Sequence, residues 1–267
     1  MTRAKVFRIR FAATALALLL AVAITRLLWY PGGYFAISGV SRLLLVLAVV
    51  VVVLGPGLST VLYKPGKPGL KFDLIVIACA EIVVFGWALF EIHNRRPAFT
   101  VFAVDRFEVV ARSEIDLTPL VDSRLATRPG HAPRLIYAAL PTDPEVMSQL
   151  IDDTVFLGMS DIDRRPEFWE PYAQGVATMK ARARPLSLYL ALGEDLAGPV
   201  QRWLTASNAK ASDYIYLPVR GRRSDAMMIV HADVGYPVGI VAVDPWQQFP
   251  SAPENGPPAG DIEQTHQ

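Results

Sequence analysis

Three long apolar segments dominate the first 90 residues of the chain. They run over about 11–30, 43–63 and 72–90, and each has about the 20 apolar residues that a helix needs to cross a bilayer. The second segment has no charge and contains five consecutive valines, 49–53. A valine-rich run could form a buried strand, but three such segments in close succession favour membrane helices. The pattern therefore predicts three transmembrane helices within residues 11–92, behind a short basic N-terminus (1–10).

From residue 97 onward the pattern changes to short alternating stretches. Alternation and β-forming residues predict one long or two short strands over 98–110. Further strands are predicted at 134–140, 214–219, 226–231 and 238–243, and helices at 145–156, 171–183 and 199–206. This order predicts an α+β domain with an antiparallel sheet over 93–246. The proline-rich segment 247–267 is predicted to be a disordered tail.

The charge is divided unequally along the chain. The whole chain has 26 basic and 25 acidic residues, so its formal net charge is only +1. Residues 1–71 nevertheless contain nine Lys or Arg and no Asp or Glu, which leaves the remainder net acidic. The single cysteine, Cys79, lies in the third apolar segment and excludes a disulfide-built domain.

Short basic flanks predict how the helices are oriented. Positive charge gathers before the first segment and between the second and third, at Lys64, Lys67 and Lys71. Such flanks remain in the cytoplasm, so everything after about His93 is expected on the outer side of the membrane. The sequence Ala21-Val22-Ala23 also permits a cleaved signal peptide. Cleavage would leave the final position of the C-terminal domain unchanged.

Two features inside the apolar segments are unusual. Glu81 is an ionisable residue near the middle of the third segment, where a charge is costly without a partner. It either serves a function or forms a hydrogen bond inside the bundle. Gly55-Pro56-Gly57 must loosen the second helix, because proline removes a hydrogen-bond donor. Small residues also allow another helix to approach closely, which could be one of the chain's own helices or a foreign one.

Motifs of catalysis and metal binding are missing from the sequence. The four histidines are scattered without metal-ligand spacing, and there is no nucleophile elbow, P-loop or dinucleotide fingerprint. His231 and Asp233 could form a general-base pair, although such pairs at strand ends are usually solvated. The acidic outer domain offers no basic face for nucleic acid. We therefore expect no catalysis, cofactor, metal, nucleic acid or small-molecule substrate.

The order of several short motifs resembles the TfpX/TfpZ family of type IV pilin accessory proteins. The motifs are Trp29-Tyr30-Pro31, Leu54-Gly55-Pro56, Lys71 with Asp73-Leu74, Arg96-Pro97, Val104-Asp105-Arg106-Phe107, Arg165-Pro166, Pro171-Tyr172, Tyr216-Leu217-Pro218, Gly221-Arg222 and Asp244-Pro245-Trp246. The resemblance covers about residues 1–246. One departure is that valines precede Leu54, where the family often has an acidic residue. Glu81 could then serve that contact instead.

The resemblance implies a multi-pass inner-membrane protein that assists the assembly or stability of a cognate type IV pilin without catalysis. A pilin awaiting assembly has one apolar helix in the membrane and a globular head outside. The expected contacts with the pilin helix are Gly55, Pro56, Gly57 and Glu81. The expected contacts with its head are Asp105, Arg106, Phe107, Arg220, Arg222 and Arg223.

Simpler roles exist for these outer residues. Asp105 and Arg106 could form a local ion pair, and the three arginines could be a solvated turn. Two other functions also stay open, namely a pilin-modifying enzyme such as a group transferase and a membrane sensor with a periplasmic domain. The sensor would need a cytoplasmic output module, and the cytoplasmic segments predicted here are only about ten residues long.

Overall fold

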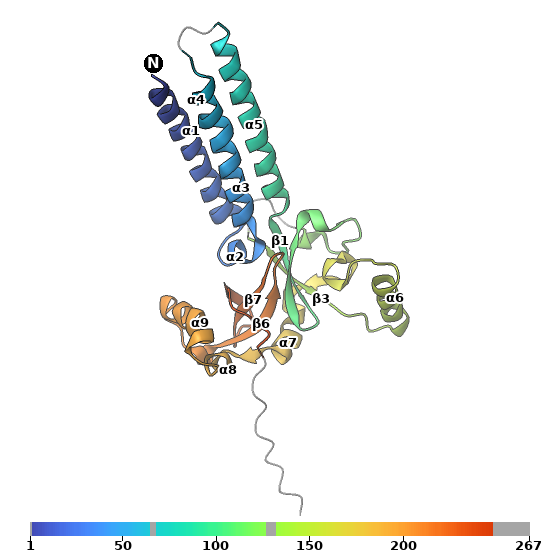
Figure 1. Cartoon of the computed structure of the whole chain (residues 1–267). Coiled ribbons are helices and arrows are strands. Elements are labelled where there is room, and N and C mark those ends of the chain that lie inside the picture. The colour runs from blue at the N-terminus through green and yellow to red at the C-terminus, as the bar shows by residue number, and fades with distance from the viewer. Residues whose placement is uncertain (1, 65–67, 127–131, 248–267) are drawn as a thin grey trace, which may run out of the picture.

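The computed structural model describes residues 2–64, 68–126 and 132–247. Long helices stand side by side at one end of the molecule, and a domain built on one sheet lies at the other end (Figure 1). The predicted fold class, an N-terminal three-helix region followed by an α+β domain, is confirmed. Most of the segment predicted as a disordered tail, residues 248–267, lies outside the described residues.

Three helices are long and apolar enough to cross a membrane, over Ala4–Trp29, Val40–Leu62 and Leu70–Asn94. The first joins α1 (Arg3–Ile24) to a π-helical turn (Thr25–Trp29), and a short helix, α2 (Tyr34–Ser38), follows it. The second is α3 (Val40–Val52), a π-helical segment (Val53–Leu58) and α4 (Ser59–Leu62), and the third is α5 (Leu70–Asn94). Each begins two or more residues before its predicted start.

The sheet contains eight strands in the described chain. They are β1 (Pro97–Ala103), β2 (Arg106–Ala111), β3 (Arg134–Ala138), β4 (Trp169–Pro171), β5 (Arg184–Pro185), β6 (Tyr214–Arg220), β7 (Asp225–His231) and β8 (Pro237–Val241). Their order is β4-β3-β1-β2-β6-β7-β8, and β5 pairs with the edge of β6. The helices of the domain are α6 (Pro144–Val155), α7 (Tyr172–Arg182), α8 (Leu186–Leu190) and α9 (Glu194–Ala206).

The sheet is mixed, and this differs from the predicted antiparallel sheet. Most neighbouring strands are antiparallel, but β1 pairs with β3 and β2 pairs with β6 in parallel. Parallel neighbours need a long crossover connection. Here more than 20 residues separate β1 from β3, and more than 100 separate β2 from β6. Alternation along one strand reports which face is buried but not which distant strand lies beside it.

Apolar side chains bury both faces of the sheet. Phe99, Val101 and Trp169 belong to a cluster on one face, which α6 covers in part through Leu150. The other face carries a cluster that includes Phe102 and Met228 and is covered by α7. A third cluster packs α8 and α9 against β6 and β7 on the same face as Phe99. The central strand β1 is consequently buried along its whole length.

The helix containing Pro199 begins earlier than predicted. We expected it to start at proline, a residue favoured in the first turn, but α9 begins at Glu194 and holds Pro199 in its interior. Glu194 and Asp195 in the first turn complement the positive end of the helix dipole. Burial of Val200 and Leu204 against the sheet holds the helix together across the proline.

The bundle and the sheet are joined by more than the chain itself. Only Arg95 and Arg96 separate α5 from β1, so the third helix leads directly into the central strand. The hydroxyl groups of Tyr34 and Thr100 lie 2.7 Å apart. The backbone N–H of Arg223 donates to the carbonyl of Ile37 over 3.0 Å, and the Ile37 side chain is buried in the sheet cluster. Helix α2 thus fastens the membrane helices to the domain.

Candidate functional site

A strip of charged side chains crosses one face of the sheet at β2 and β6. Arg106 donates from Nε to Glu108 Oε1 over 3.0 Å and from Nη1 to Asp105 Oδ1 over 3.2 Å. Arg220 lies 3.4 Å from the same Glu108 oxygen, because Glu108 is paired with Arg220 in the register of the two strands. We call Asp105, Arg106, Glu108 and Arg220 the charged strip.

The charged strip unites two stretches that the sequence analysis treated separately. Asp105 and Arg106 were predicted contacts on one strand, and Arg220 was a predicted contact far along the chain. The residue that joins them, Glu108, was not predicted. Its signal was the alternation of Arg106, Glu108 and Val110, which places Arg106 and Glu108 on one face of β2. The pairing of β2 with β6 carried no such signal.

The carboxyl of Glu108 has a shifted pKa because it is buried at the centre of the charged strip. Burial raises the pKa of its carboxyl above 4.5, the nearby Asp163 raises it further, and Arg220 and Arg106 oppose the shift. Burial also raises the pKa of Asp163, which forms an ion pair with Arg164. Removing one partner from a buried ion pair is costly. The buried carboxyl of Glu108 therefore fixes two arginines whose side chains remain partly exposed.

The charged strip lies between two apolar clusters on the same face of the sheet. The Phe99 cluster is on the β1 and β3 side, and the cluster of α8 and α9 is on the β6 and β7 side. At the end of the strip distant from the membrane helices, a cavity of about 560 Å³ opens. It is lined by Asp105, Arg182, Arg184, Tyr216, Pro218, Pro245, Trp246 and Gln247. Arg182 and Arg184 add basic residues that the sequence analysis missed.

The turn before the charged strip is strained. Val104 connects β1 to β2 with a φ of 58°, in the left-handed region. A β-branched residue rarely adopts this conformation. The N–H of Asp105 donates to the carbonyl of Ala103 over 2.7 Å, which closes the tight turn. Such strain concentrates at functional sites, and here it sets the direction of Asp105 and exposes the Val104 side chain.

Phe107 points to the opposite face of the sheet. Its side chain is 0% exposed, and its ring lies 5.5 Å from that of Phe102 and 6.2 Å from that of Tyr172 between centroids. Alternation along β2 requires this, since Arg106 and Glu108 occupy the other face. The expectation that Phe107 meets a partner is therefore corrected. Phe107 stabilises the sheet and offers a partner no exposed surface.

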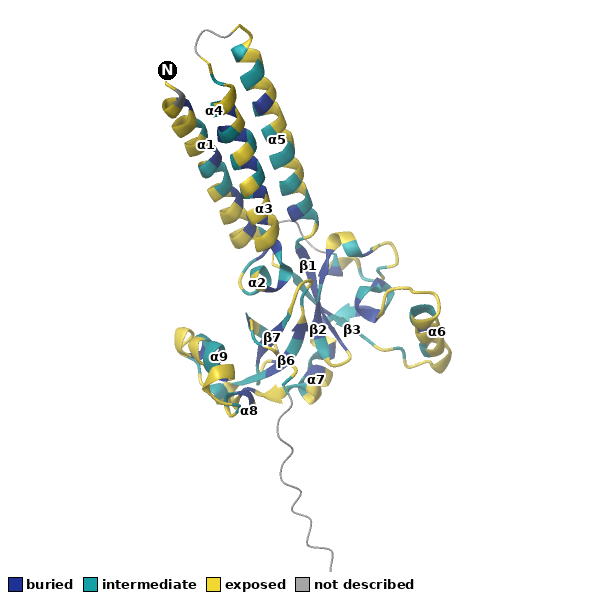
Figure 2. Cartoon of the chain, viewed as in Figure 1, coloured by how far each residue is buried: buried dark blue, intermediate teal, exposed yellow. Residues whose placement is uncertain are grey.

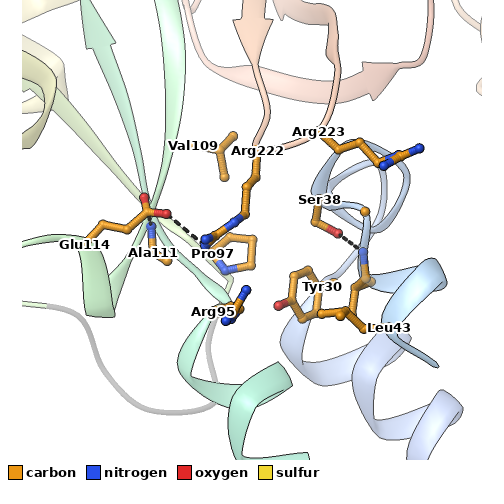
Figure 3. A pocket seen from close by; sticks show the side chains of 12 residues that line it. Tyr30, Ser38, Leu43, Arg95, Pro97, Val109, Ala111, Glu114, Arg222 and Arg223 are labelled. Carbon is orange, nitrogen blue, oxygen red and sulfur yellow. Dashed lines mark hydrogen bonds and ion pairs between the residues drawn. The ribbon is translucent and has the colours of Figure 1, made fainter. Parts of the chain in front are cut away.

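The remaining two predicted arginines lie at the tip of the β6–β7 hairpin, beside the membrane helices. Arg222 donates from Nη1 to Glu114 Oε1 over 3.0 Å. Together with Arg95 and Tyr30 it faces a cavity of about 370 Å³ between the bundle and the sheet, while Arg223 lies at its rim above α2 (Figure 3). We call this space the junction cavity. Arg222 and Arg223 therefore lie at the end of the sheet that faces the bundle, away from the distal cavity beside Asp105.

A polar cluster lies inside the helical bundle. Thr14 of the first helix donates from its hydroxyl to Glu81 Oε1 over 2.8 Å. Gly55 is buried against the same carboxylate, and a Cβ atom at this position would lie 2.6 Å from Glu81 Cδ. Glu81 thus has a hydrogen-bond partner within the chain. The close packing of Gly55 and Glu81 holds the second and third helices together.

The π-helical segment widens the second helix beside this cluster. Pro56 cannot donate a backbone hydrogen bond, and the chain forms a π turn over Val53–Leu58. The hydroxyl of Thr60 donates to the Pro56 carbonyl over 2.6 Å. Pro56 is buried in the bundle, whereas Gly57 is half-exposed. Among the described residues, a Cβ atom at position 57 would touch only Val52 O, at 3.4 Å. Gly57 therefore leaves room for a further helix.

The predicted contact residues consequently occupy three separate places. Asp105, Arg106 and Arg220 lie together on the charged strip, and Arg222 and Arg223 lie at the junction cavity. Gly55, Pro56, Gly57 and Glu81 lie within the membrane helices.

Two curated proteins are similar to the chain over most of its length. Both come from Dichelobacter nodosus and are named fimbrial assembly proteins, one of serogroup I and one of serogroup E1. They are 25% and 24% identical to this chain over 233 residues, which is 85% of this chain and 90% of each relative. A match of this length must include parts of both the membrane helices and the sheet domain.

The names of these relatives agree with the predicted resemblance at a coarse level, that of pilus assembly. They do not distinguish the TfpX/TfpZ family from other families of fimbrial assembly. No description of a known protein family matches the chain, and no solved structure matches it.

Proposed function

We propose that this chain is a non-catalytic inner-membrane accessory protein that assists the assembly or stability of a type IV pilin. The relatives named fimbrial assembly proteins support a role in pilus assembly. The finer proposal is that the chain contacts both the membrane helix and the head of one pilin. It also includes a cytoplasmic N-terminus and a periplasmic C-terminal domain.

The observation that carries this proposal is the coupling of the bundle to the sheet. Helix α2 is fixed to the domain by the Tyr34–Thr100 hydrogen bond and by the backbone bond from Arg223 to Ile37. A partner that touches the helices and the domain together would therefore meet two surfaces at a fixed separation. Such preorganisation reduces the entropy lost on binding. A subunit with one membrane helix and one head has the matching form.

The charged strip is the proposed contact for the pilin head. Arg106 and Arg220 are held by a buried carboxylate, yet their side chains remain 28% and 48% exposed, so little side-chain freedom remains to be lost on binding. Asp105 at the strained turn adds an acceptor. Arg222 and Arg223 would meet the part of the head nearest the bilayer. Charged contacts of this kind set specificity and association rate more than affinity.

The half-exposed face of the π-helical segment is the proposed contact for the pilin helix. Gly57 permits close approach of another backbone, as small residues do in membranes. Gly55, Pro56 and Glu81 act on this contact indirectly. Their packing and the missing N–H of Pro56 determine where the helix widens.

Crosslinking inside the membrane tests the proposed helix contact. A photoreactive amino acid replaces Gly57 in the full-length protein, and the trapped species is identified by mass spectrometry. The matched control replaces Leu19, which is 67% exposed on the first helix. Pilin trapped from position 57 but not from position 19 supports the proposal. Equal trapping from both positions, or no pilin from either, would overturn the helix contact.

Charge reversal tests the head contact. Arg106→Glu and Arg220→Glu are compared with Arg202→Glu, an exposed arginine on α9 at the side of the domain. We expect the first two to lower pilus number and pilin recovered by pull-down. The double substitution of Arg222 and Arg223 by Glu extends the same test to the membrane end. Wild-type values for Arg106→Glu and Arg220→Glu would remove the charged strip from the proposal.

Topology and catalysis have tests of their own. A periplasm-dependent reporter fused after Gln267 should be active, and activity only in the cytosol would overturn the proposed orientation.

Mass spectrometry of pilin from a deletion strain separates an assembly factor from a modifying enzyme. Loss or failed assembly of pilin supports the accessory role. Abundant pilin that lacks a modification would instead support a transferase.

A further inference from the structure

An apolar groove on the membrane helices adjoins the junction cavity. The groove has a volume of about 280 Å³ and lies between α3 and α5. Its lining is Leu43, Val46, Leu47, Val50, Val84, Trp87, Ala88, Glu91, Ile92 and Arg95. Leu43 and Arg95 line both the groove and the junction cavity. The groove and the junction cavity therefore adjoin at the end of α5, beside Arg95.

The groove has the length of one leaflet. Along α5 it extends from Val84 to Arg95, and a helix rises about 1.5 Å per residue, so the groove spans about 16 Å. The hydrocarbon core of a bilayer is about 30 Å thick, and one leaflet supplies about half of it. Arg95 directly follows α5, and a basic residue at the end of a membrane helix is typical of the boundary with the headgroups. An acyl chain in the groove would thus place its headgroup at the cavity.

The lining of the junction cavity is cationic. It includes Arg95, Arg222 and Arg223, and Glu114 is its acidic member. Within the described residues Arg95 forms its ion pair with Glu91 through Nε, and Arg222 pairs with Glu114 through Nη1. A guanidinium group has five N–H donors. Both arginines therefore retain donors for a phosphate. Arg222 reaches the cavity from the β6–β7 hairpin and Arg95 from the end of α5 (Figure 3).

We propose that the groove and the junction cavity bind one anionic phospholipid from the leaflet adjoining the sheet domain. Its phosphate lies between Arg95 and Arg222, and one acyl chain lies between α3 and α5. Bidentate arginine contacts suit phosphate geometry. The lipid would fill the space between the bundle and the sheet and so reinforce their fixed arrangement. The site requires only that the three helices lie in a bilayer, and it stands whether or not the partner of the chain is a pilin.

Native mass spectrometry of the full-length protein in mild detergent tests the lipid site. The protein is titrated separately with phosphatidylglycerol and with phosphatidylcholine, and inorganic phosphate serves as a competitor. We expect one phosphatidylglycerol to be retained about tenfold more strongly than phosphatidylcholine, because the cavity is cationic. Inorganic phosphate should not displace it, since phosphate alone cannot use the groove. Equal retention of both lipids, or displacement by phosphate at equimolar concentration, would overturn the proposal.

Paired variants separate the two parts of the site. The double variant R95Q/R222Q removes the phosphate contacts, and Val46→Trp fills the groove from an exposed position on α3. Their controls are Arg202→Gln on α9 and Val49→Trp, an exposed position of α3 outside the groove. Each site variant should lose retained phosphatidylglycerol about tenfold while the controls keep it. Because Val46→Trp alters only a membrane-facing surface, unchanged retention in that variant would contradict the proposal even if R95Q/R222Q failed to fold.

Discussion

The bundle and the sheet domain distribute their polar side chains in opposite ways. In the bundle, Thr14 and Glu81 meet between the helices, while Leu19 and Val83 are more than 60% exposed on the outside. In the domain, Phe99 is fully buried, and β1 is coloured as buried in Figure 2, whereas Asp105 and Arg220 of the charged strip are exposed. The difference indicates two solvents, lipid around the helices and water around the domain.

The same difference locates the functional surfaces. A partner in lipid gains little from apolar contact, because lipid is as apolar as leucine, so shape and small residues such as Gly57 matter there. A partner in water can recognise the charged strip through Arg106 and Arg220. The junction cavity adjoins both environments, and its lining is accordingly both apolar and cationic.

The largest expected effect contrasts a core residue of the domain with an outward residue of the bundle. Phe99→Ala removes a ring that is 0% exposed and should destabilise the domain by about 3–5 kcal/mol. Leu19→Ala removes a side chain that faces lipid and should change the unfolding free energy by less than about 1 kcal/mol. Denaturant unfolding in detergent, followed by near-UV circular dichroism, measures both. Similar losses would show that the bundle exterior is packed like the domain core.

A smaller effect is expected where the two regions meet. Gly221 lies against α2, and a Cβ atom there would be 2.7 Å from the Ile37 carbonyl oxygen and 2.6 Å from that of Ser224. Because both obstacles are backbone atoms, Gly221→Ala should cost about 1–3 kcal/mol. Hydrogen exchange of the Arg223 amide, which donates to Ile37, should become faster. Gly198→Ala on α9 is the control, since only one side-chain atom lies near it.

The sequence predicted the elements of the fold better than their arrangement. The apolar segments predicted the three membrane helices, and alternation predicted the two strands of the β6–β7 hairpin, because both patterns arise from local periodicity. The parallel pairing of β2 with β6 depends on packing across more than 100 residues. For this reason Arg106 and Arg220 could be named as candidates, but neither their shared partner Glu108 nor the burial of Phe107 was predicted.

The contact between α2 and the sheet domain could not be predicted from the sequence, for a related reason. No helix and no contact were predicted for the loop between the first two apolar segments, yet α2 within it packs on the sheet through Ile37. No local pattern connects Ile37 to Arg223, nearly 190 residues later. The junction cavity, which depends on this contact, could be found only in three dimensions.

Relief of strain at the turn should produce a gain of stability. Val104→Gly permits the φ of 58° without a steric penalty, and we expect the domain to become more stable by about 1 kcal/mol. If the strain serves to direct Asp105, the same variant should weaken pilin recovery while raising the unfolding midpoint. Val234→Gly, at another exposed valine of a loop, is the control and should lower the midpoint or leave it unchanged. A lower midpoint for Val104→Gly would contradict strain at the turn.

A still smaller effect is expected for the hydrogen bond inside the bundle. Thr14→Val keeps the shape of the side chain and removes the donor to Glu81. Hydrogen bonds between membrane helices contribute about 0.6 kcal/mol on average, so the bundle should be destabilised by about that amount. Thr178→Val, at an exposed position of α7, is the matched control in water. A loss of several kcal/mol for Thr14→Val would indicate that Glu81 depends on this bond far more than such pairs usually do.

The pH dependence of the domain should show two carboxyls acting in opposite directions. Burial raises the pKa of Glu108 above 4.5, so the folded state binds its proton more tightly than the unfolded state does. The associated stability is present below pH 4.5 and is lost as the pH rises through the raised pKa. For Asp116, hydrogen bonds from Thr118 lower the pKa below 3.8, so its contribution is present above pH 3.8 and is lost as the pH falls through the lowered value.

Unfolding midpoints of the wild type, Glu108→Gln and Asp116→Asn between pH 3 and pH 8 measure both contributions. The midpoint of the wild type relative to Glu108→Gln should fall as the pH rises above 4.5, because the variant lacks the titrating group. The midpoint of the wild type relative to Asp116→Asn should fall only at the lowest pH values measured, near and below pH 3.8. The first effect is expected to be modest, since Arg106 and Arg220 oppose the shift in Glu108. A rise with pH relative to Glu108→Gln would mean that the two arginines outweigh burial, and the charged strip would then be held together mainly by its ion pairs.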